Sequence, residues 1–132
     1  MTIDRFKRFK WLSILIWGIL NVIFITIGII GIAVGNYYLL YFYFLEIVFL
    51  IMFIFSFAIS IKEFNIDGVN IVIYAGWEKH YLIVNGELVD EHITAFAFTP
   101  IELKYNDDKH NYYALISLSN SITFKLDGKL IK

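Results

Sequence analysis

The chain has no cysteine and only one proline among its 132 residues. Without cysteine, neither disulfide bonds nor thiolate metal sites can support a fold, and the absence also fits a reducing compartment. Charge is missing from one long stretch, because residues 11–61 carry a single charged side chain, Glu46. A run of 51 residues this poor in charge predicts membrane-spanning helices rather than part of a small soluble domain.

Two apolar runs make up this stretch, residues 11–34 and 37–61, with Gly35-Asn36 between them. A bilayer core about 30 Å thick needs roughly 20 apolar residues per helix, so each run is long enough to cross once. A cleaved signal peptide is the alternative for the first run, but its 24 residues are too many and no small-x-small cleavage site follows. We therefore expect a membrane α-helical hairpin of two transmembrane helices.

The distribution of charge predicts how the hairpin is oriented. Four basic residues precede the first run, and the linker between the runs has no charge: Arg5, Lys7, Arg8 and Lys10. The positive-inside bias places this basic segment, residues 1–10, in the cytoplasm. Two crossings return the chain to the same side, so residues 62–132 are also expected in the cytoplasm, at a bacterial-type plasma membrane.

Small residues recur along one side of the first run. On a helix of 3.6 residues per turn they form a single stripe: Gly18, Asn21, Gly28, Gly31 and Gly35. The G-x-x-x-G spacing at its end allows another helix to approach closely. We expect the second run to pack there, with Phe42, Phe49 and Phe53 in the groove, and dimerisation between two copies is the alternative.

Glu46 lies about ten residues beyond the linker, hence roughly 15 Å deep and near the middle of the bilayer. An ionised carboxylate at that depth costs at least a few kcal/mol unless it is paired. Thr26 is expected level with Glu46 in an antiparallel hairpin. Asn21 lies about one and a half helical turns before Thr26, further from the linker. The three residues form a candidate intramembrane polar site, which is either a proton or ion relay or a structural contact within the hairpin.

Residues 62–132 have the pattern of a water-soluble domain, with seven Lys against ten Asp or Glu. Apolar and polar residues alternate, as in Ile101-Glu-Leu-Lys-Tyr105, which predicts β-strands. Asn85-Gly86 and Asp127-Gly128 lie between such runs and favour type I′ hairpin turns. We expect a small all-β sandwich or flattened barrel of about six to eight antiparallel strands.

An internal repeat supports this fold, because residues 81–90 match residues 123–132 position by position. Two similar β-meanders, stacked face to face, would bury both apolar faces. With apolar-x-apolar-Asp/Asn-Gly-x-apolar closing each half, residues 69–132 resemble the β-sandwich of the Fas apoptotic inhibitory molecule family. The resemblance implies a fold only, since that family is soluble and has no membrane hairpin.

The domain contains little that indicates chemistry. Its three histidines, His80, His92 and His110, show no tight ligand pair, so no metal site is expected. Asp90-Glu91-His92 has no nucleophile beside it and fits a solvated turn. Phosphate-binding loops, dinucleotide fingerprints and basic strips are missing, so neither a cofactor nor a nucleic-acid partner is expected. Trp77, His80 and His92 remain as a possible binding surface.

Taken together, these features predict a non-enzymatic integral membrane protein whose cytoplasmic β-domain binds a protein partner or self-associates. An accessory, regulatory or immunity-type subunit has this character. The alternative is an oligomeric channel or transporter element that uses Glu46. Apart from the bilayer itself, the expected partner is another protein or a second copy of the chain.

Overall fold

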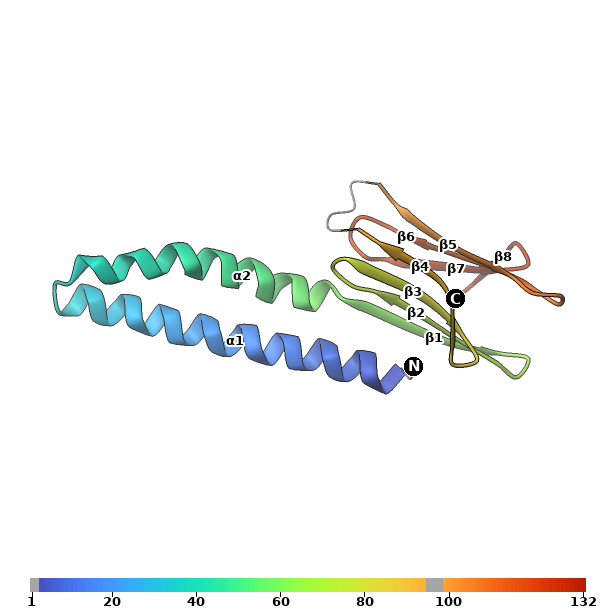
Figure 1. The fold of residues 1–132 in the computed structure, drawn as a ribbon, viewed down its shortest axis with the longest axis horizontal. Coiled ribbons are helices and arrows are strands. Elements are labelled where there is room, and N and C mark those ends of the chain that lie inside the picture. Colours follow the sequence, from blue (N-terminus) through green and yellow to red (C-terminus); the bar gives the residue numbers. More distant parts are fainter. Residues whose placement is uncertain (1–2, 95–98) are drawn as a thin grey trace. The chain divides into compact units, whose positions relative to one another are not determined.

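The computed structural model describes residues 3–94 and 99–132, and the chain divides into two compact units. The hairpin is Arg8–Phe57. The β unit combines Met1–Lys7 with Ala58–Lys132. Figure 1 shows the helices and strands of both units, which are described in turn.

Three helical elements build the hairpin: α1 (Ile3–Ala33), the 3-10 helix η1 (Tyr37–Tyr41) and α2 (Phe42–Ala58). Gly35 ends α1 in a left-handed conformation with φ of 69°. The Asn36 amide donates to the Gly31 carbonyl at 2.9 Å, and the Gly35 amide donates to the Ile32 carbonyl at 3.2 Å. This pair of bonds is a Schellman motif, which satisfies carbonyl groups at the end of a helix.

Among the described residues, α1 is the helix that is long and apolar enough to cross a membrane. Residues 37–61 were predicted to form one continuous span, but the structure divides them among three elements. The first five residues form η1, the next 17 form α2, and strand β1 begins at Ser60. Strand pairing explains the early end of α2, because Ser60 and Ile61 pair with Ala75 and Tyr74 of strand β2.

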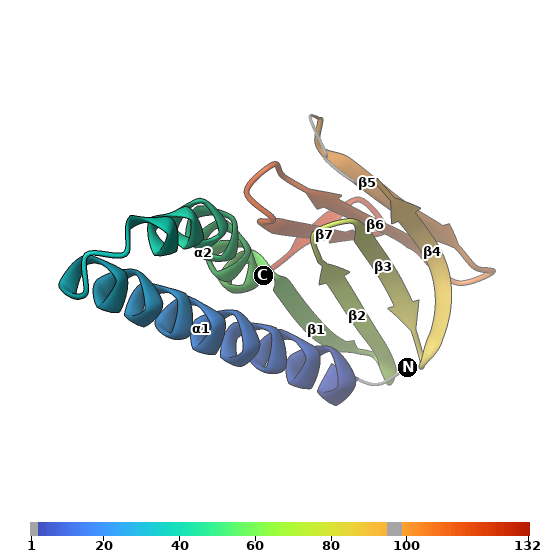
Figure 2. The ribbon, with the colours of Figure 1, turned by 60° about the vertical axis from the view of Figure 1, so that its left-hand side comes forward.

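In the described part of the β unit, eight strands form two antiparallel sheets, which confirms the predicted antiparallel fold of six to eight strands. In sheet A the order is β1 (Ser60–Ile66), β2 (Val69–Ala75), β3 (Lys79–Val84) and β4 (Glu87–Ile93). In sheet B the order is β5 (Ile101–Asn106), β6 (Asn111–Ile116), β7 (Ile122–Leu126) and β8 (Lys129–Ile131). Figure 2 shows both meanders.

Both predicted hairpin turns are present, and each joins the third and fourth strands of its sheet. Asn85 and Asp127 have φ of 50°, and the glycine after each has φ of 82° and 81°. Positive φ at both central residues is what a type I′ turn requires. The two repeat segments therefore occupy equivalent places in the two sheets.

The inner faces of the two sheets share one apolar core. Ile73 and Leu82 of sheet A and Leu103 and Ala114 of sheet B are all completely buried in it. The rings of Phe64 and Phe124, one from each sheet, stack with centroids 5.0 Å apart. Alternation along each strand produces this face, since every second side chain points inward.

A second core covers the outer face of sheet A. Phe6, from the first turns of α1, is buried there together with Ile59, Val72, Tyr74 and Ile83. Its ring stacks on Tyr74 with centroids 4.6 Å apart. The beginning of the chain is therefore part of the β unit, which the basic character of residues 1–10 did not predict.

Candidate functional site

Polar side chains in the hairpin are buried between its own helices. Ser13, Asn21, Glu46 and Ser56 are 9%, 7%, 8% and 0% exposed. Large apolar side chains on the same helices face outward, and Val22 and Ile47, for example, are 65% and 58% exposed. This arrangement is the reverse of that in a water-soluble protein.

One polar contact joins the helices through hydroxyl groups. The Oγ atoms of Ser13 and Ser56 lie 2.7 Å apart, and Ser56 also donates to the Met52 carbonyl at 2.9 Å. A hydroxyl has one proton to donate, so Ser13 is the donor to Ser56. The contact therefore links the two helices with a complete hydrogen-bond chain.

Asn21 makes the second polar link. Its Nδ2 donates to the Trp17 carbonyl in α1 at 2.6 Å and to the Phe49 carbonyl in α2 at 3.1 Å. Both amide protons are used, and the Oδ1 atom is left buried with no partner among the described residues. Asn21 thus connects the helices and still offers one buried acceptor.

Glu46 is the remaining buried polar residue of the hairpin. Its Oε2 atom has no hydrogen-bond partner within residues 3–94 and 99–132. The predicted neighbour Thr26 does not meet it, because Thr26 is exposed and donates to the Val22 carbonyl of its own helix at 2.7 Å. The structure therefore places Asn21 and Glu46 in the hairpin interior and leaves Thr26 outside, with its hydroxyl satisfied by a local bond.

The glycine stripe brings α1 close to aromatic residues of α2. A Cβ atom at Gly18 would lie 3.2 Å from the Phe53 ring, and one at Gly28 would lie 2.5 Å from the Tyr43 ring. Phe53 was among the expected partners, whereas Tyr43 was missed. Tyr43 could have been found from its spacing of three residues from Glu46, because this spacing puts Tyr43 and Glu46 on one face of α2.

The other residues of the stripe differ in role. Gly31 is buried in α1, while Gly35 lies beyond the helix and would have nothing within 4 Å of an added Cβ. Gly35 therefore serves to end α1 through its positive φ and does not pack against a helix. Phe42 and Phe49, also expected in the groove, both lie beside Phe24, with ring centroids 5.4 and 4.8 Å from it.

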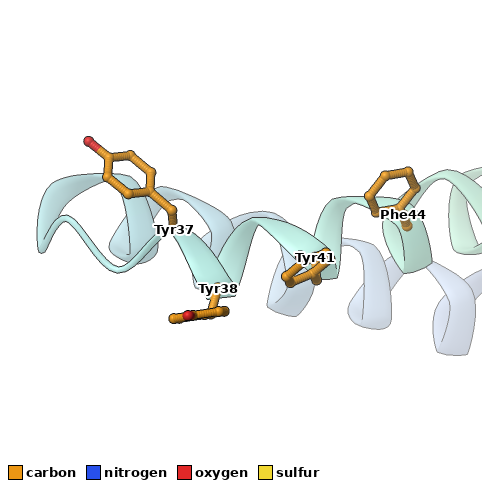
Figure 3. A pocket seen from close by; sticks show the side chains of 4 residues that line it. All are labelled: Tyr37, Tyr38, Tyr41 and Phe44. Carbon is orange, nitrogen blue, oxygen red and sulfur yellow. The ribbon is translucent and has the colours of Figure 1, made fainter.

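Aromatic residues surround the linker end of the hairpin. A shallow hollow there is lined by Tyr37, Tyr38, Tyr41 and Phe44, and each of these side chains is at least 65% exposed. Figure 3 shows the Tyr37 and Phe44 rings on one side of the ribbon and the Tyr38 ring on the other. Because the rings diverge, they do not enclose a ligand, and their uncharged aromatic character is typical of a membrane interface.

The predicted binding surface of Trp77, His80 and His92 requires a correction. His80 is only 2% exposed, because it alternates with Tyr81 along β3 and lies on the inward face with Leu82. His92 pairs with it across the sheet and is exposed, and Trp77 packs partly buried against the second core. Burial lowers the pKa of the His80 imidazole, so this residue is a core histidine and not a surface ligand.

The outer face of sheet B is the polar surface that the sequence did not reveal. Tyr113 donates to Glu102 at 3.0 Å, and Lys104 lies 3.1 Å from the same carboxylate. The ammonium groups of Lys104 and Lys125 lie 5.8 and 5.9 Å from the Tyr113 ring centroid. The hydrogen bond from Lys104 lowers the pKa of Glu102. Three strands thus present one aromatic ring framed by charges.

Side-chain hydrogen bonds also join the two sheets. Lys62 of β1 donates to the Ile122 carbonyl at the start of β7 at 3.0 Å. Asp90 of β4 accepts the Lys104 amide of β5 at 2.7 Å. These two hydrogen bonds join the sheets to each other at Lys62 and at Asp90.

Acids at the turns of the β unit act on the backbone. Asp107 accepts the amides of Lys109 and His110, and Asp127 accepts the Asn111 amide at 2.8 Å. Asp127 also lies 2.7 Å from His110 Nδ1, which raises the pKa of His110. No group of His and acidic residues suited to a metal ion occurs in the described part of the chain. These contacts stabilise turns.

Comparison with models of protein families, with curated proteins and with solved structures finds no match to this chain. The likeness of residues 69–132 to the Fas apoptotic inhibitory molecule sandwich therefore rests on the turn pattern alone.

Proposed function

We propose that the chain is an integral membrane protein whose hairpin crosses the bilayer twice and holds the β unit in the cytoplasm. The reversed polarity of the hairpin carries this proposal. Among the described residues, 25 of the 29 exposed large apolar side chains belong to the hairpin, while its serines, Asn21 and Glu46 are buried. Such a surface is stable in lipid and strongly unfavourable in water.

The second crossing is supported by the combined length of η1 and α2. The 17 residues of α2 extend about 26 Å, and the five residues of η1 add about 10 Å. The sum is close to the thickness of a bilayer core, about 30 Å. The exposed tyrosines of η1 then lie at the outer interface, where aromatic belts form.

The second core supports a cytoplasmic β unit and a retained first helix. Phe6 and Ile59, which lie near the start of α1 and just after α2, are buried in the same cluster. Both ends of the hairpin therefore belong on the same side of the membrane, and the basic residues beside Phe6 favour the cytoplasmic side. Removal of α1 as a signal sequence would also strip Phe6 from the β unit.

The proposed activity is binding of a protein partner, or of a second copy, by the outer face of sheet B. Sheet A has its outer face covered by the chain's own Phe6. Sheet B instead exposes Glu102, Lys104 and Lys125 around the half-buried Tyr113. Tyrosine is enriched in protein interfaces, and charged residues occur at their polar rim, so a central Tyr113 with charges around it suits an accessory, regulatory or immunity-type subunit.

The mass of the complex in mild detergent tests this proposal. Protein extracted from its own membranes should run well above the 15.5 kDa of one chain, either as an oligomer or with a partner. The double variant Tyr113→Ala and Lys104→Ala should reduce the mass of the complex to that of the single chain. Lys109→Ala, in the turn between β5 and β6, should leave that mass unchanged. A wild-type protein that runs alone as one chain would refute the binding proposal.

A second function, an oligomeric channel or transporter element, is favoured by one observation. Asn21 Oδ1 and Glu46 Oε2 are both buried acceptors with no hydrogen-bond partner in the described residues. Acceptors of this kind in a membrane segment can take up a proton or a donor from another subunit. Glu46→Gln should then abolish ion or proton flux in reconstituted vesicles, with Ser56→Ala as the control that retains it.

A further inference from the structure

The two ends of the β sandwich differ in character. The junction end contains Ala58, where the chain leaves α2, together with the β2–β3 and β6–β7 turns. The far end contains four turns, at Asp67-Gly68, Asn85-Gly86, Asp107–His110 and Asp127-Gly128. Antiparallel pairing separates these ends, since Ser60 pairs with Ala75 at the junction end and Ile66 pairs with Val69 at the far end.

Asn120 ties the junction end together. Its Nδ2 atom lies 3.1 Å from the Ala58 carbonyl and 3.4 Å from the Gly76 carbonyl in the β2–β3 turn. Within its own turn, the Ser117 amide donates to the Ser121 carbonyl and the Asn120 amide donates to the Ser117 carbonyl, each at 2.9 Å. The β6–β7 turn is therefore held firmly against the point where the chain enters the β unit.

This turn presents an apolar residue to its surroundings. Leu118 is 61% exposed within the sequence Ser117-Leu-Ser-Asn-Ser121, and no residue of that sequence carries a charge. Ile93 is 59% exposed at the end of β4, where it pairs with Lys79 beside the β2–β3 turn, and the exposed Glu78 and Lys79 there carry opposite charges. The turns of the far end, in contrast, contain no large apolar side chain and have four aspartates against Lys109 and His110: Asp67, Asp107, Asp108 and Asp127.

We infer that the junction end of the β unit lies against the cytoplasmic surface of the bilayer, with Leu118 and Ile93 inserted among the lipid headgroups. The inference rests on the proposed membrane hairpin. Ala58 is the last residue of α2, so a membrane-spanning α2 places it near headgroup depth, and Asn120 holds the Leu118 turn to that same residue. An apolar side chain gains by leaving water there, and an uncharged turn meets no desolvation cost for a charge.

Charge on the β unit favours the same orientation. Arg5 and Lys7 are exposed on either side of Phe6, which shares its cluster with Ile59 next to the junction. Basic side chains near a bilayer are attracted by anionic lipids. The four aspartates of the far-end turns outnumber Lys109 and His110, so anionic lipids repel this end and favour its position toward the cytoplasm.

The lack of cysteine makes a direct test possible, because each introduced cysteine is the single labelling site. The variants Leu118→Cys and Ile93→Cys are labelled with a fluorophore and reconstituted in vesicles of phosphatidylcholine and phosphatidylglycerol that contain headgroup spin-labelled lipid. Leu88→Cys and Leu130→Cys are matched controls, since both residues are exposed and apolar but lie in strands that start at far-end turns. Unchanged thermal melting verifies that each variant folds.

Quenching at positions 118 and 93 should exceed that at positions 88 and 130 several-fold. Equal quenching at all four positions, or none at 118 and 93, overturns the inference. Ile19→Cys in the hairpin tests the membrane location separately from the contact surface. A label there must be quenched by acyl-chain spin labels if the hairpin is in the bilayer. Loss of the Ile19 signal refutes the membrane proposal itself, whereas a quenched Ile19 with an unquenched Leu118 refutes only the contact surface.

Discussion

The hairpin and the β unit distribute polarity in opposite ways within one chain. In the β unit, residues such as Leu103 and Phe124 are inside and lysines are outside. In the hairpin, Ser56 and Asn21 are inside and isoleucines are outside. A surface that matches its solvent explains both patterns if the β unit lies in water and the hairpin, as proposed, lies in lipid.

The same comparison explains how each unit is held together. The β unit buries a large apolar core between two sheets, so its stability derives mainly from the removal of apolar surface from water. In the proposed lipid environment the hairpin has no such driving force, so it would depend on close packing at Gly18 and Gly28 and on the polar links of Ser13 and Asn21. Equivalent substitutions in the two units should therefore have different consequences.

The largest expected effect is from Phe124→Ala in the β core. Phe124 is 1% exposed and stacks on Phe64, so its loss leaves a cavity and should lower the free energy of unfolding by about 3–5 kcal/mol. Phe44→Ala is the matched control in the hairpin, where the ring is 69% exposed. Chemical denaturation of the full chain in detergent measures both, and an equal loss for Phe44→Ala would contradict the contrast between the units.

The next effect concerns a charge on the outside of each unit. Val22→Arg places a cation on the exposed surface of α1 near the centre of the first run, which should disfavour insertion by about 2.5–3.5 kcal/mol. Leu130→Arg, on a strand surface that is also exposed, should be nearly neutral. Resistance to alkaline extraction from membranes measures the difference, and full resistance of Val22→Arg would show that this surface does not face lipid.

The pH dependence of the β unit should reveal the buried His80. Because burial lowers its folded pKa below 6.5, the unfolded chain binds the proton more readily. Stability is then complete above the unfolded pKa and falls as the pH drops below about 6.5, by at most about 1.4 kcal/mol per pH unit. Thermal melting between neutral and mildly acidic pH should show this slope in the wild type and in His92→Gln, while His80→Gln should flatten it. An unchanged slope in His80→Gln would assign the effect to another group.

Much of the β unit could be predicted because its signals are local. An Asn-Gly or Asp-Gly pair favours positive φ at two adjacent residues, and strand alternation extends from each turn. The aromatic partner of Gly18 was also foreseeable from helical spacing. The switch at Ser60 was not, since residues 37–61 form one continuous apolar run whose periodicity does not separate a helix from a strand.

Other features depend on contacts between distant residues. A phenylalanine in a basic segment, Phe6, carries no sign that it will cover Tyr74 of a sheet. His80 is buried because it lies on the inward face of β3, whereas its residue type alone suggests a position at the protein surface. The group around Tyr113 needs the register of three strands, which pairs Tyr113 with Lys104 and Lys125. These positions are determined by tertiary packing, which local patterns do not encode.

The smallest expected effect tests the polar interior of the hairpin. Ser13→Ala removes the donor to Ser56 Oγ and should weaken association of α1 with α2 by only about 0.6 kcal/mol, as is typical of hydrogen bonds between membrane helices. Asn21→Ala removes two donors and should cost more, because the Phe49 carbonyl loses its link to α1. Unfolding of the hairpin in mixed detergent micelles measures both, and Thr26→Ala is the control whose exposed hydroxyl bonds only within α1. If Thr26→Ala were as costly as Asn21→Ala, the interior position of these polar groups would contribute nothing to holding the helices together.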